Sequence, residues 1–220
     1  MLGKLLRKSS NVAASKFALA VAWTGINPSV FTSLALFWAV AAAVALWREM
    51  PVLSIPLVAI AAGWDALDGA VARVQDKTSL FGKYIEGIID KWVEIIIYAG
   101  IFLAGYQLQA FVLLSTSFML SMAKPRLSLV VPFDEHDWPG IGERVDRMTL
   151  LVLGLAVAAL IPEFKIAGFT IQTMSLWLYV ISAVVLVGHA QRVRYGTQLI
   201  EQHIRGRGPL LKHKHQVDSA

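Results

Sequence analysis

Long apolar stretches, separated by short polar segments, run along almost the whole chain. Six of them are long enough to cross a hydrocarbon core about 30 Å thick, which takes about 20 helical residues. By residue number they lie at about 29–47, 51–75, 82–104, 107–125, 147–164 and 169–191. The pattern predicts an all-α integral membrane protein with six transmembrane helices. The second and third stretches carry charges at one end, so their boundaries are the least sharply defined.

The two ends of the chain differ from this pattern. At the N-terminus, basic residues precede an apolar run that Lys16 interrupts, so we predict an amphipathic helix on the membrane surface over residues 4–24 rather than a signal peptide. Residues 201–220 are basic and poor in apolar side chains, and we expect a disordered cytoplasmic tail there. One transmembrane domain is therefore predicted over residues 1–200, with residues 1–25 as its surface helix.

Composition supports a membrane protein. Of the 220 residues, 56% are hydrophobic and only 16% are charged, whereas soluble domains are about 25% charged. There is no cysteine, which excludes disulfides and thiolate metal sites.

Basic residues predict the orientation in the membrane. Of the 20 Lys and Arg residues, only Arg48 and Lys165 fall in segments assigned to the outer side, which leaves 18 for the inner side. By the positive-inside rule, both termini face the cytoplasm. The net charge of +5 then follows from topology and contact with anionic lipid, and we expect no nucleic-acid partner.

Four acids stand in or beside the second and third apolar stretches, where an unpaired carboxylate is costly. Asp65 and Asp68 are three residues apart and Glu86 and Asp90 are four apart, so each pair shares one helix face. Two antiparallel helices would bring the pairs together near the cytoplasmic boundary. Carboxylates that close repel one another unless a cation lies among them. Oxygen-only ligands favour Mg²⁺, Mn²⁺ or Ca²⁺.

Small residues beside the acids leave the helix faces bare. Gly69 and Ala72 do so on the second helix, and Gly82 and Gly87 on the third. Such faces occur in ordinary helix packing as well as beneath a bound ligand. Arg73, one turn past Gly69, offers a planar fork for phosphate. The acids, a metal, the arginine and the bare backbone together predict a site for a nucleotide diphosphate.

The same residues form the row Asp65-x2-Asp68-Gly69-x2-Ala72-Arg73-x8-Gly82-x3-Glu86-x3-Asp90. This row resembles the signature of the CDP-alcohol phosphotransferases, D-x2-DG-x2-AR-x8-G-x3-D-x3-D, and differs from it at one fixed position. The difference is Glu86, where the family has Asp.

The resemblance implies six transmembrane helices, usually in a homodimer. It implies transfer of a phosphoryl-alcohol group from a CDP-linked alcohol to an acceptor hydroxyl, with release of CMP. One or two Mg²⁺ or Mn²⁺ ions would be held by Asp65, Asp68, Glu86 and Asp90, and Asp90 would also be the general base. The nucleotide site that the resemblance implies consists of Ser29, Thr32, Asp65, Asp68, Gly69, Ala72, Arg73 and Gly82.

A second set of residues resembles the acceptor motifs of the family. Ser121-x2-Lys124-x-Arg126 is similar to the S-Y-x-K-A-R pattern of members with phosphorylated acceptors, with Pro125 in place of Ala. Glu143-Arg144-x2-Arg147 is similar to the E-R-x2-R of the inositol-phosphate branch. Positive-inside charges alone would also place basic residues here, but their grouping with Ser121 favours a pocket for a phosphate monoester. Its predicted residues are Ser121, Lys124, Arg126, Arg144 and Arg147.

We therefore predict a phosphatidyltransferase of phospholipid synthesis in a prokaryotic cytoplasmic membrane, with its active site facing the cytoplasm. The donor would be CDP-diacylglycerol or CDP-archaeol, and the acceptor inositol phosphate. Glycerol 3-phosphate as acceptor, and synthesis of a di-inositol phosphate from CDP-inositol, are alternatives. A cation transporter is an alternative from another class, because acids inside a bundle also mark ion paths. Against it, the acids lie near the inner boundary beside Arg73 and Lys83 rather than at mid-membrane.

Overall fold

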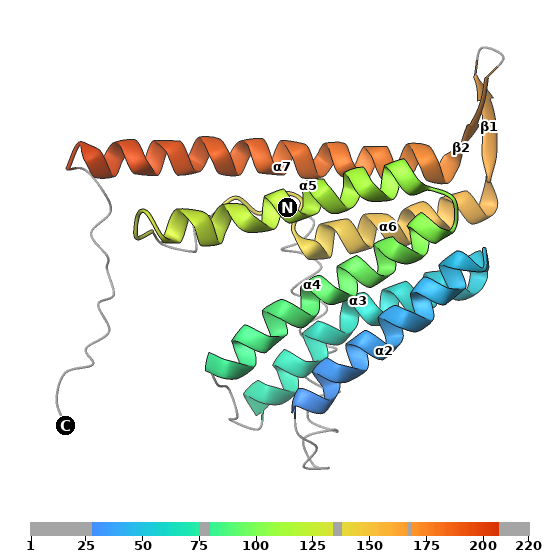
Figure 1. Cartoon of the computed structure of the whole chain (residues 1–220), viewed down its shortest axis with the longest axis horizontal. Coiled ribbons are helices and arrows are strands. Elements are labelled where there is room, and N and C mark those ends of the chain that lie inside the picture. The colour runs from blue at the N-terminus through green and yellow to red at the C-terminus, as the bar shows by residue number, and fades with distance from the viewer. Residues whose placement is uncertain (1–27, 75–79, 134–137, 167–168, 207–220) are drawn as a thin grey trace.

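The computed structural model of the chain describes residues 28–74, 80–133, 138–166 and 169–206 (Figure 1). Within these ranges only the backbone is described for residues 28–33, 65–74, 80, 83 and 166. The predicted N-terminal surface helix and residues 207–220 of the predicted tail lie outside the described residues.

The described part of the chain is mostly helical. Its elements are α2 (Pro28–Trp47), α3 (Pro51–Val74), α4 (Leu80–Leu103), α5 (Gln107–Ser128), α6 (Arg144–Leu160), β1 (Glu163–Ile166), β2 (Phe169–Gln172) and α7 (Thr173–Ile204). Each of the six helices overlaps one predicted apolar stretch, and the first four begin within two residues of the prediction. The all-helical fold class is therefore confirmed apart from the short hairpin.

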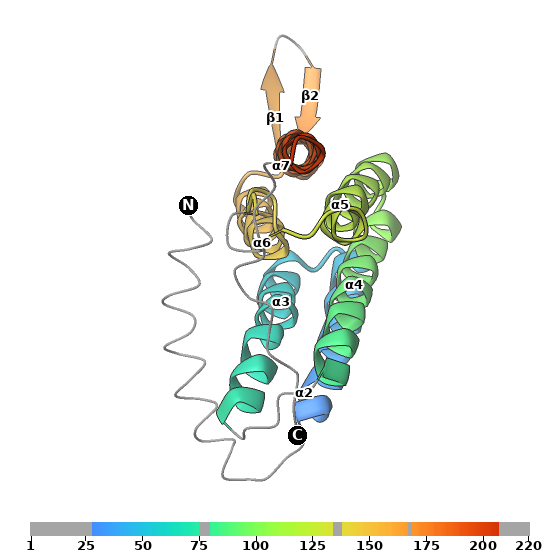
Figure 2. The same cartoon turned by 90° about the vertical axis from the view of Figure 1, so that its left-hand side faces the viewer.

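The helices form two groups that pack on each other. α2 packs against both α3 and α4, whereas α7 packs against α5 and α6; α3 also contacts α6, and α4 contacts α5. Figure 2 shows α5 and α6 flanking α7, with α3 and α4 beyond them. Small residues allow the closest approach: a Cβ on Gly100 would lie 2.5 Å from the Cα of Ala43. Small-residue packing of this kind is typical of helices in membranes.

One apolar core joins all six helices. It contains fully buried side chains from each of them, among which are Ala39, Val58, Val93, Leu113, Leu151 and Leu178. The outer faces of the helices are also apolar: Phe37, Phe111 and Leu186 are 62%, 63% and 52% exposed. Soluble monomers rarely expose so much apolar surface.

Length and composition identify α7 as a helix able to cross a membrane. Among the described residues it is the only whole helix that is both long enough and apolar enough. Leu34–Trp47 and Pro51–Trp64 are shorter apolar segments. Six transmembrane spans therefore remain a prediction.

The segment before α7 differs from the prediction. A short loop and a helix beginning at residue 169 were expected, but residues 163–172 contain an antiparallel hairpin in which Phe164 pairs with Ile171 and Lys165 with Thr170. Aromatic and β-branched residues alternate with polar ones in both strands, and this period of two favours strands. The two strands project away from the helices at the start of α7 (Figures 1 and 2).

α7 also runs further than predicted, to Ile204 rather than 191, so the first residues of the predicted tail are helical. The extension is stabilised by buried residues: Leu199 is 6% exposed, and Gly196 lies against Leu127 of α5.

The short connections predicted for the outer side gather at one end of the bundle. Met50, Gly105 and Pro162, one from each, line a single cavity of about 380 Å³. The connection between α5 and α6 is longer, and its described residues are not helical. Every second connection along the chain therefore lies at this end of the bundle, as expected for antiparallel helices.

Candidate active site

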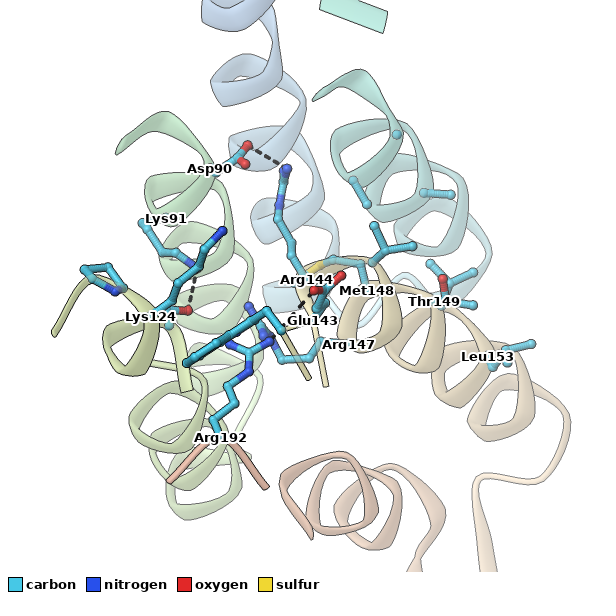
Figure 3. Close-up of a pocket in the computed structure, with 18 residues that line it drawn as sticks. Asp90, Lys91, Lys124, Glu143, Arg144, Arg147, Met148, Thr149, Leu153 and Arg192 are labelled. Atoms are coloured by element: carbon cyan, nitrogen blue, oxygen red, sulfur yellow. Dashed lines mark hydrogen bonds and ion pairs between the residues drawn. The ribbon is translucent and has the colours of Figure 1, made fainter. Parts of the chain in front are cut away.

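A cavity of about 670 Å³ opens between α3, α4, α5, α6 and α7 (Figure 3). It brings together predicted site residues that are far apart in the sequence. They are Asp90 of α4, Ser121 and Lys124 of α5, and Arg144 and Arg147 of α6. Gly63, two residues before Asp65 on α3, also lines the cavity, so the cavity adjoins the first part of the acidic motif.

Asp90 and Arg144 are in direct contact. The Arg144 Nη1 donates a hydrogen bond of 2.6 Å to the Asp90 Oδ1, and Figure 3 shows the arginine extending from the start of α6 toward α4. Both side chains are partly buried, at 13% and 25% exposed. The contact places the predicted base beside the predicted acceptor-binding residues.

Arg147 is held by a buried acid that sequence reasoning missed. Its Nε donates to the Glu94 Oε1 at 2.9 Å, its Nη2 donates to the same oxygen, and its Nη1 donates to the Gly142 carbonyl at 2.6 Å. Arg147 and Glu94 are only 2% and 3% exposed. A signal was present in the sequence, because Glu94 follows Glu86 and Asp90 at the same four-residue spacing and so lies on their helix face.

Lys91 completes this network. Its Nζ donates to the Glu94 Oε2 at 3.0 Å and to the Ser121 Oγ at 2.7 Å. The Ser121 hydroxyl in turn donates to the Ser117 carbonyl at 2.9 Å. One carboxylate thus connects α4 with α6 directly and with α5 through Lys91.

Arg192 of α7 anchors the connection that precedes α6. Its Nη1 donates to the Leu120 carbonyl at 3.0 Å and its Nε to the Pro139 carbonyl at 3.2 Å. The guanidinium also lies over the Trp138 ring, 5.7 Å from its centroid, and 3.9 Å from the Glu143 carboxylate. Sequence reasoning missed Arg192 because it ended the last helix at 191.

Arg126 does not join the other predicted acceptor residues. It is exposed and does not line the cavity, although Lys124 does. Two residues apart on a helix differ in direction by about 200°, so α5 turns Lys124 and Arg126 to opposite sides. The linear motif groups two side chains that the helix separates, and a contact between Arg126 and the acceptor stays a prediction.

The acidic face of α4 is partly described. Glu86 lies one turn before Asp90 on the same face and is partly buried, but it does not line the cavity. Gly82 and Gly87 are exposed, and a Cβ on Gly87 would meet nothing within 4 Å. The backbone at Gly87 is therefore open, as a close-lying ligand would require.

Comparison with known proteins gives the family. The sequence profile described as CDP-alcohol phosphatidyltransferase matches residues 25–188, which is most of the chain. The chain belongs to the CDP-alcohol phosphatidyltransferase family. It is thus a transferase of phospholipid biosynthesis, and the cation-transporter alternative is set aside.

Relatives within the CDP-alcohol phosphatidyltransferases are named for an inositol-phosphate product. An archaetidylinositol phosphate synthase of Pyrococcus horikoshii is 28% identical over 186 residues, which cover 84% of this chain and 95% of that protein. Another, of Aeropyrum pernix, is 27% identical over 170 residues and covers 77% and 82%.

The fold matches solved structures of Mycobacterium tuberculosis phosphatidylinositol phosphate synthase. One with CDP-DAG bound has a TM-score of 0.67 at 20% identity and covers 83% of this chain and 92% of that one. A complex with manganese and citrate has a TM-score of 0.65 at 20% identity and covers 84% and 88%. The helical arrangement is therefore that of a CDP-alcohol phosphatidyltransferase.

Much of the family signature lies where side chains are not described. Its residues on α3, and the predicted nucleotide contacts at the start of α2, have a helical backbone only; they are Asp65, Asp68, Gly69, Ala72, Arg73, Ser29 and Thr32. Among the side chains that are described, no group of three or more metal-ligating residues occurs. The donor set is nevertheless four carboxylates without His or Cys, which fits a hard divalent cation. The metal site remains a prediction.

Proposed function

We propose that this CDP-alcohol phosphatidyltransferase transfers the phosphatidyl group of a CDP-lipid to a hydroxyl of inositol phosphate. The observation that carries the proposal is the contact between Asp90 and Arg144 inside a cavity walled by basic side chains. The two curated relatives, both archaetidylinositol phosphate synthases, support the same acceptor.

The charges around the cavity suit a phosphate monoester. Its basic lining residues are Lys91, Lys124, Arg144, Arg147 and Arg192, whereas its acidic ones are Asp90 and Glu143. A phosphate monoester carries about −1.5 to −2 charges at neutral pH and offsets most of the excess, which is five basic against two acidic lining residues. The cavity volume of about 670 Å³ also lies within the range of about 300–1,000 Å³ that is usual for small-molecule sites.

The proposed reaction uses Asp90 as the general base. Its carboxylate takes the proton from the acceptor hydroxyl, whose oxygen forms a bond to the lipid-linked phosphorus of the CDP-lipid. The bond from that phosphorus to the oxygen of CMP breaks, and CMP leaves. An aspartate is intrinsically a weak base, so positioning supplies much of the rate. Arg144 provides it by contacting the acceptor phosphate while it lies beside Asp90.

Asp65, Asp68, Glu86 and Asp90 would hold one or two Mg²⁺ or Mn²⁺ ions. When bound there, such an ion would offset negative charge on the donor pyrophosphate and on the CMP that leaves. Arg73 and the bare backbone at Gly69, Ala72 and Gly82 complete the nucleotide site in this proposal. The manganese in a solved relative supports a divalent ion of this kind.

The proposed setting is a prokaryotic cytoplasmic membrane crossed by all six helices, with the Asp90 cavity and both termini facing the cytoplasm and the protein forming a homodimer. The exposed apolar side chains on the outer helix faces support contact with lipid. CDP-diacylglycerol or CDP-archaeol then reaches the cavity sideways from the bilayer, and the polar acceptor reaches it from the cytoplasm.

An acceptor panel tests the proposal. Purified protein in lipid nanodiscs is given radiolabelled CDP-diacylglycerol or CDP-archaeol with inositol phosphate, glycerol 3-phosphate, free inositol or serine, and CDP-inositol with inositol phosphate in a separate assay. We expect CMP release and a labelled lipid with inositol phosphate. Faster turnover with glycerol 3-phosphate would reassign the acceptor, and activity with serine but with no phosphorylated acceptor would contradict the phosphate pocket.

A further inference from the structure

We infer that Lys91 is a further contact to the acceptor phosphate, and that Glu94 and Ser121 are positioning residues that aim it. The inference rests on the proposed function, since it concerns how the same cavity recognises the phosphate of its acceptor. It reassigns Ser121, which the motif alone presents as a phosphate ligand.

The hydrogen bonds of Ser121 carry the first step. Its hydroxyl donates to the Ser117 carbonyl and its Oγ accepts from the Lys91 Nζ. A serine hydroxyl has a single hydrogen to donate, and here that hydrogen points along α5. Ser121 therefore orients Lys91 instead of donating to an anion in the cavity.

The geometry of Lys91 carries the second step. An ammonium group has three donors, and two of those on Lys91 point to Glu94 and Ser121. The side chain lines the cavity and is 34% exposed. Within the described part of the chain these two bonds leave the third donor for a group that enters the cavity, where a phosphate oxygen would accept a charge-assisted hydrogen bond.

Glu94 fixes two cations with two different oxygens. Its Oε1 accepts from Arg147 and its Oε2 from Lys91. Glu94 does not line the cavity and is 3% exposed, so it does not touch substrate. The negative charge of Glu94 also offsets the repulsion between Arg147 and Lys91. Its bond to Arg147 ties α6 to α4.

A purely structural ion pair would behave differently from a positioning one. If Glu94 only joined α4 to α6, its loss would lower stability without changing the balance between donor and acceptor affinity. If it aims Lys91, both residues affect the acceptor KM selectively, and an arginine at position 91 restores recognition because it keeps the charge.

The experiment compares Lys91→Met, Lys91→Arg and Glu94→Gln with the wild type, using steady-state CMP release. Lys165→Met is the matched control, because it removes one exposed lysine on the hairpin away from the cavity. We expect Lys91→Met to raise the KM for inositol phosphate about tenfold, the effect of losing one charge-assisted hydrogen bond. The KM for CDP-lipid should change less than about twofold, because the hydrogen bond that is lost belongs to the acceptor and not to the donor.

The companion variants complete the expected pattern. Lys91→Arg should recover most of the acceptor affinity, Glu94→Gln should weaken it in the same direction as Lys91→Met, and Lys165→Met should match the wild type. Inhibition by inorganic phosphate, competitive with the acceptor, should weaken in parallel with KM in Lys91→Met.

The outcomes separate the two proposals. An active wild type whose acceptor KM is unchanged in Lys91→Met overturns the inference and leaves the proposed function standing. A folded Glu94→Gln with unchanged acceptor KM overturns the positioning role, and if Glu94→Gln does not fold, Lys91→Met decides the inference alone. A wild type that uses no phosphorylated acceptor contradicts the proposed function, and the inference falls with it.

Discussion

At the scale of single residues, Asp90 lies where the proposed donor site and the proposed acceptor site meet. Glu86, one turn earlier, belongs to the donor motif of the family signature, while Arg144 and Lys124 belong to the acceptor side. Because Arg144 is hydrogen-bonded to Asp90, an acceptor phosphate that binds Arg144 necessarily arrives beside the proposed base. A direct contact of this kind would couple binding of the acceptor to deprotonation of its hydroxyl without a further conformational change.

Replacing Asp90 with Asn removes the proposed base and keeps the size of the side chain. We expect kcat to fall by about 10²–10⁴-fold, the usual contribution of general-base catalysis, while CDP-lipid still binds. CMP release and equilibrium nucleotide binding measure the two effects. Asp146→Asn, an equal loss of charge in the first turn of α6 and outside the cavity lining, should turn over normally. Unchanged turnover in Asp90→Asn would rule out the base.

Chelation and variants of Glu86 test the predicted dependence on a divalent metal. We expect EDTA to stop CMP release and Mg²⁺ or Mn²⁺ to restore it. Glu86→Gln removes a charged ligand and should raise the half-saturating metal concentration at least about tenfold, whereas Glu86→Asp, shorter by about 1.5 Å, should have a smaller effect. Glu163→Gln, on the hairpin, is the control for general charge loss. Full activity after exhaustive chelation would refute a metal-dependent reaction.

At the scale of elements, buried polar side chains join four helices around the cavity. Glu94 and Arg147 link α4 to α6, and Arg192 links α7 to α5 and to the connection before α6. A buried charge left without its partner is costly, so these links restrict how the helices pack. The positions of Arg144 and Lys124 depend on them.

Arg192→Met should destabilise the protein. It removes two hydrogen bonds from a buried guanidinium to the Leu120 and Pro139 carbonyls, each worth about 1.5–3 kcal/mol when the donor is charged. We expect a clearly lower thermal unfolding midpoint in detergent. Arg194→Met, two residues away on the exposed side of α7, is the matched control and should unfold like the wild type. Equal midpoints for the two variants would show that the anchor contributes nothing.

Helices and the acidic motif could be predicted from the sequence because both depend on local spacing. Apolar runs located six helices, and the intervals between Asp65, Asp68, Glu86 and Asp90 were sufficient to indicate the family. Contacts between helices could not be predicted in this way. Arg192 meets residues 53 and 72 positions away, and its charge alone fits a positive inner side equally well.

Two differences between prediction and structure have local causes. Arg126 was grouped with Lys124 because a linear motif does not record the direction of side chains around a helix. The hairpin was missed because strands of four residues between two apolar helices are too short to interrupt a hydropathy pattern.

At the scale of the whole molecule, the two cavities give the bundle a direction. The smaller one lies by the three short connections and includes Met174 near the start of α7, whereas the Asp90 cavity includes Arg192 toward its end. α7 has 32 residues, which span about 48 Å at 1.5 Å per residue. It is thus longer than a hydrocarbon core of about 30 Å and can carry the chain from the hairpin on one side to the region of the active-site cavity on the other.

This direction predicts which positions are accessible from each side of the membrane. The chain has no cysteine, so a single introduced cysteine reports one position without background. Lys165→Cys, in the hairpin, should react with a membrane-impermeant maleimide in intact cells, whereas Arg205→Cys, just past the end of α7, should react only after permeabilisation. The physical reason is the excess of Lys and Arg on the side that contains the cavity. The unsubstituted protein is the control and should stay unlabelled. Labelling of Arg205→Cys in intact cells would reverse the topology and place the acceptor site away from the cytoplasm.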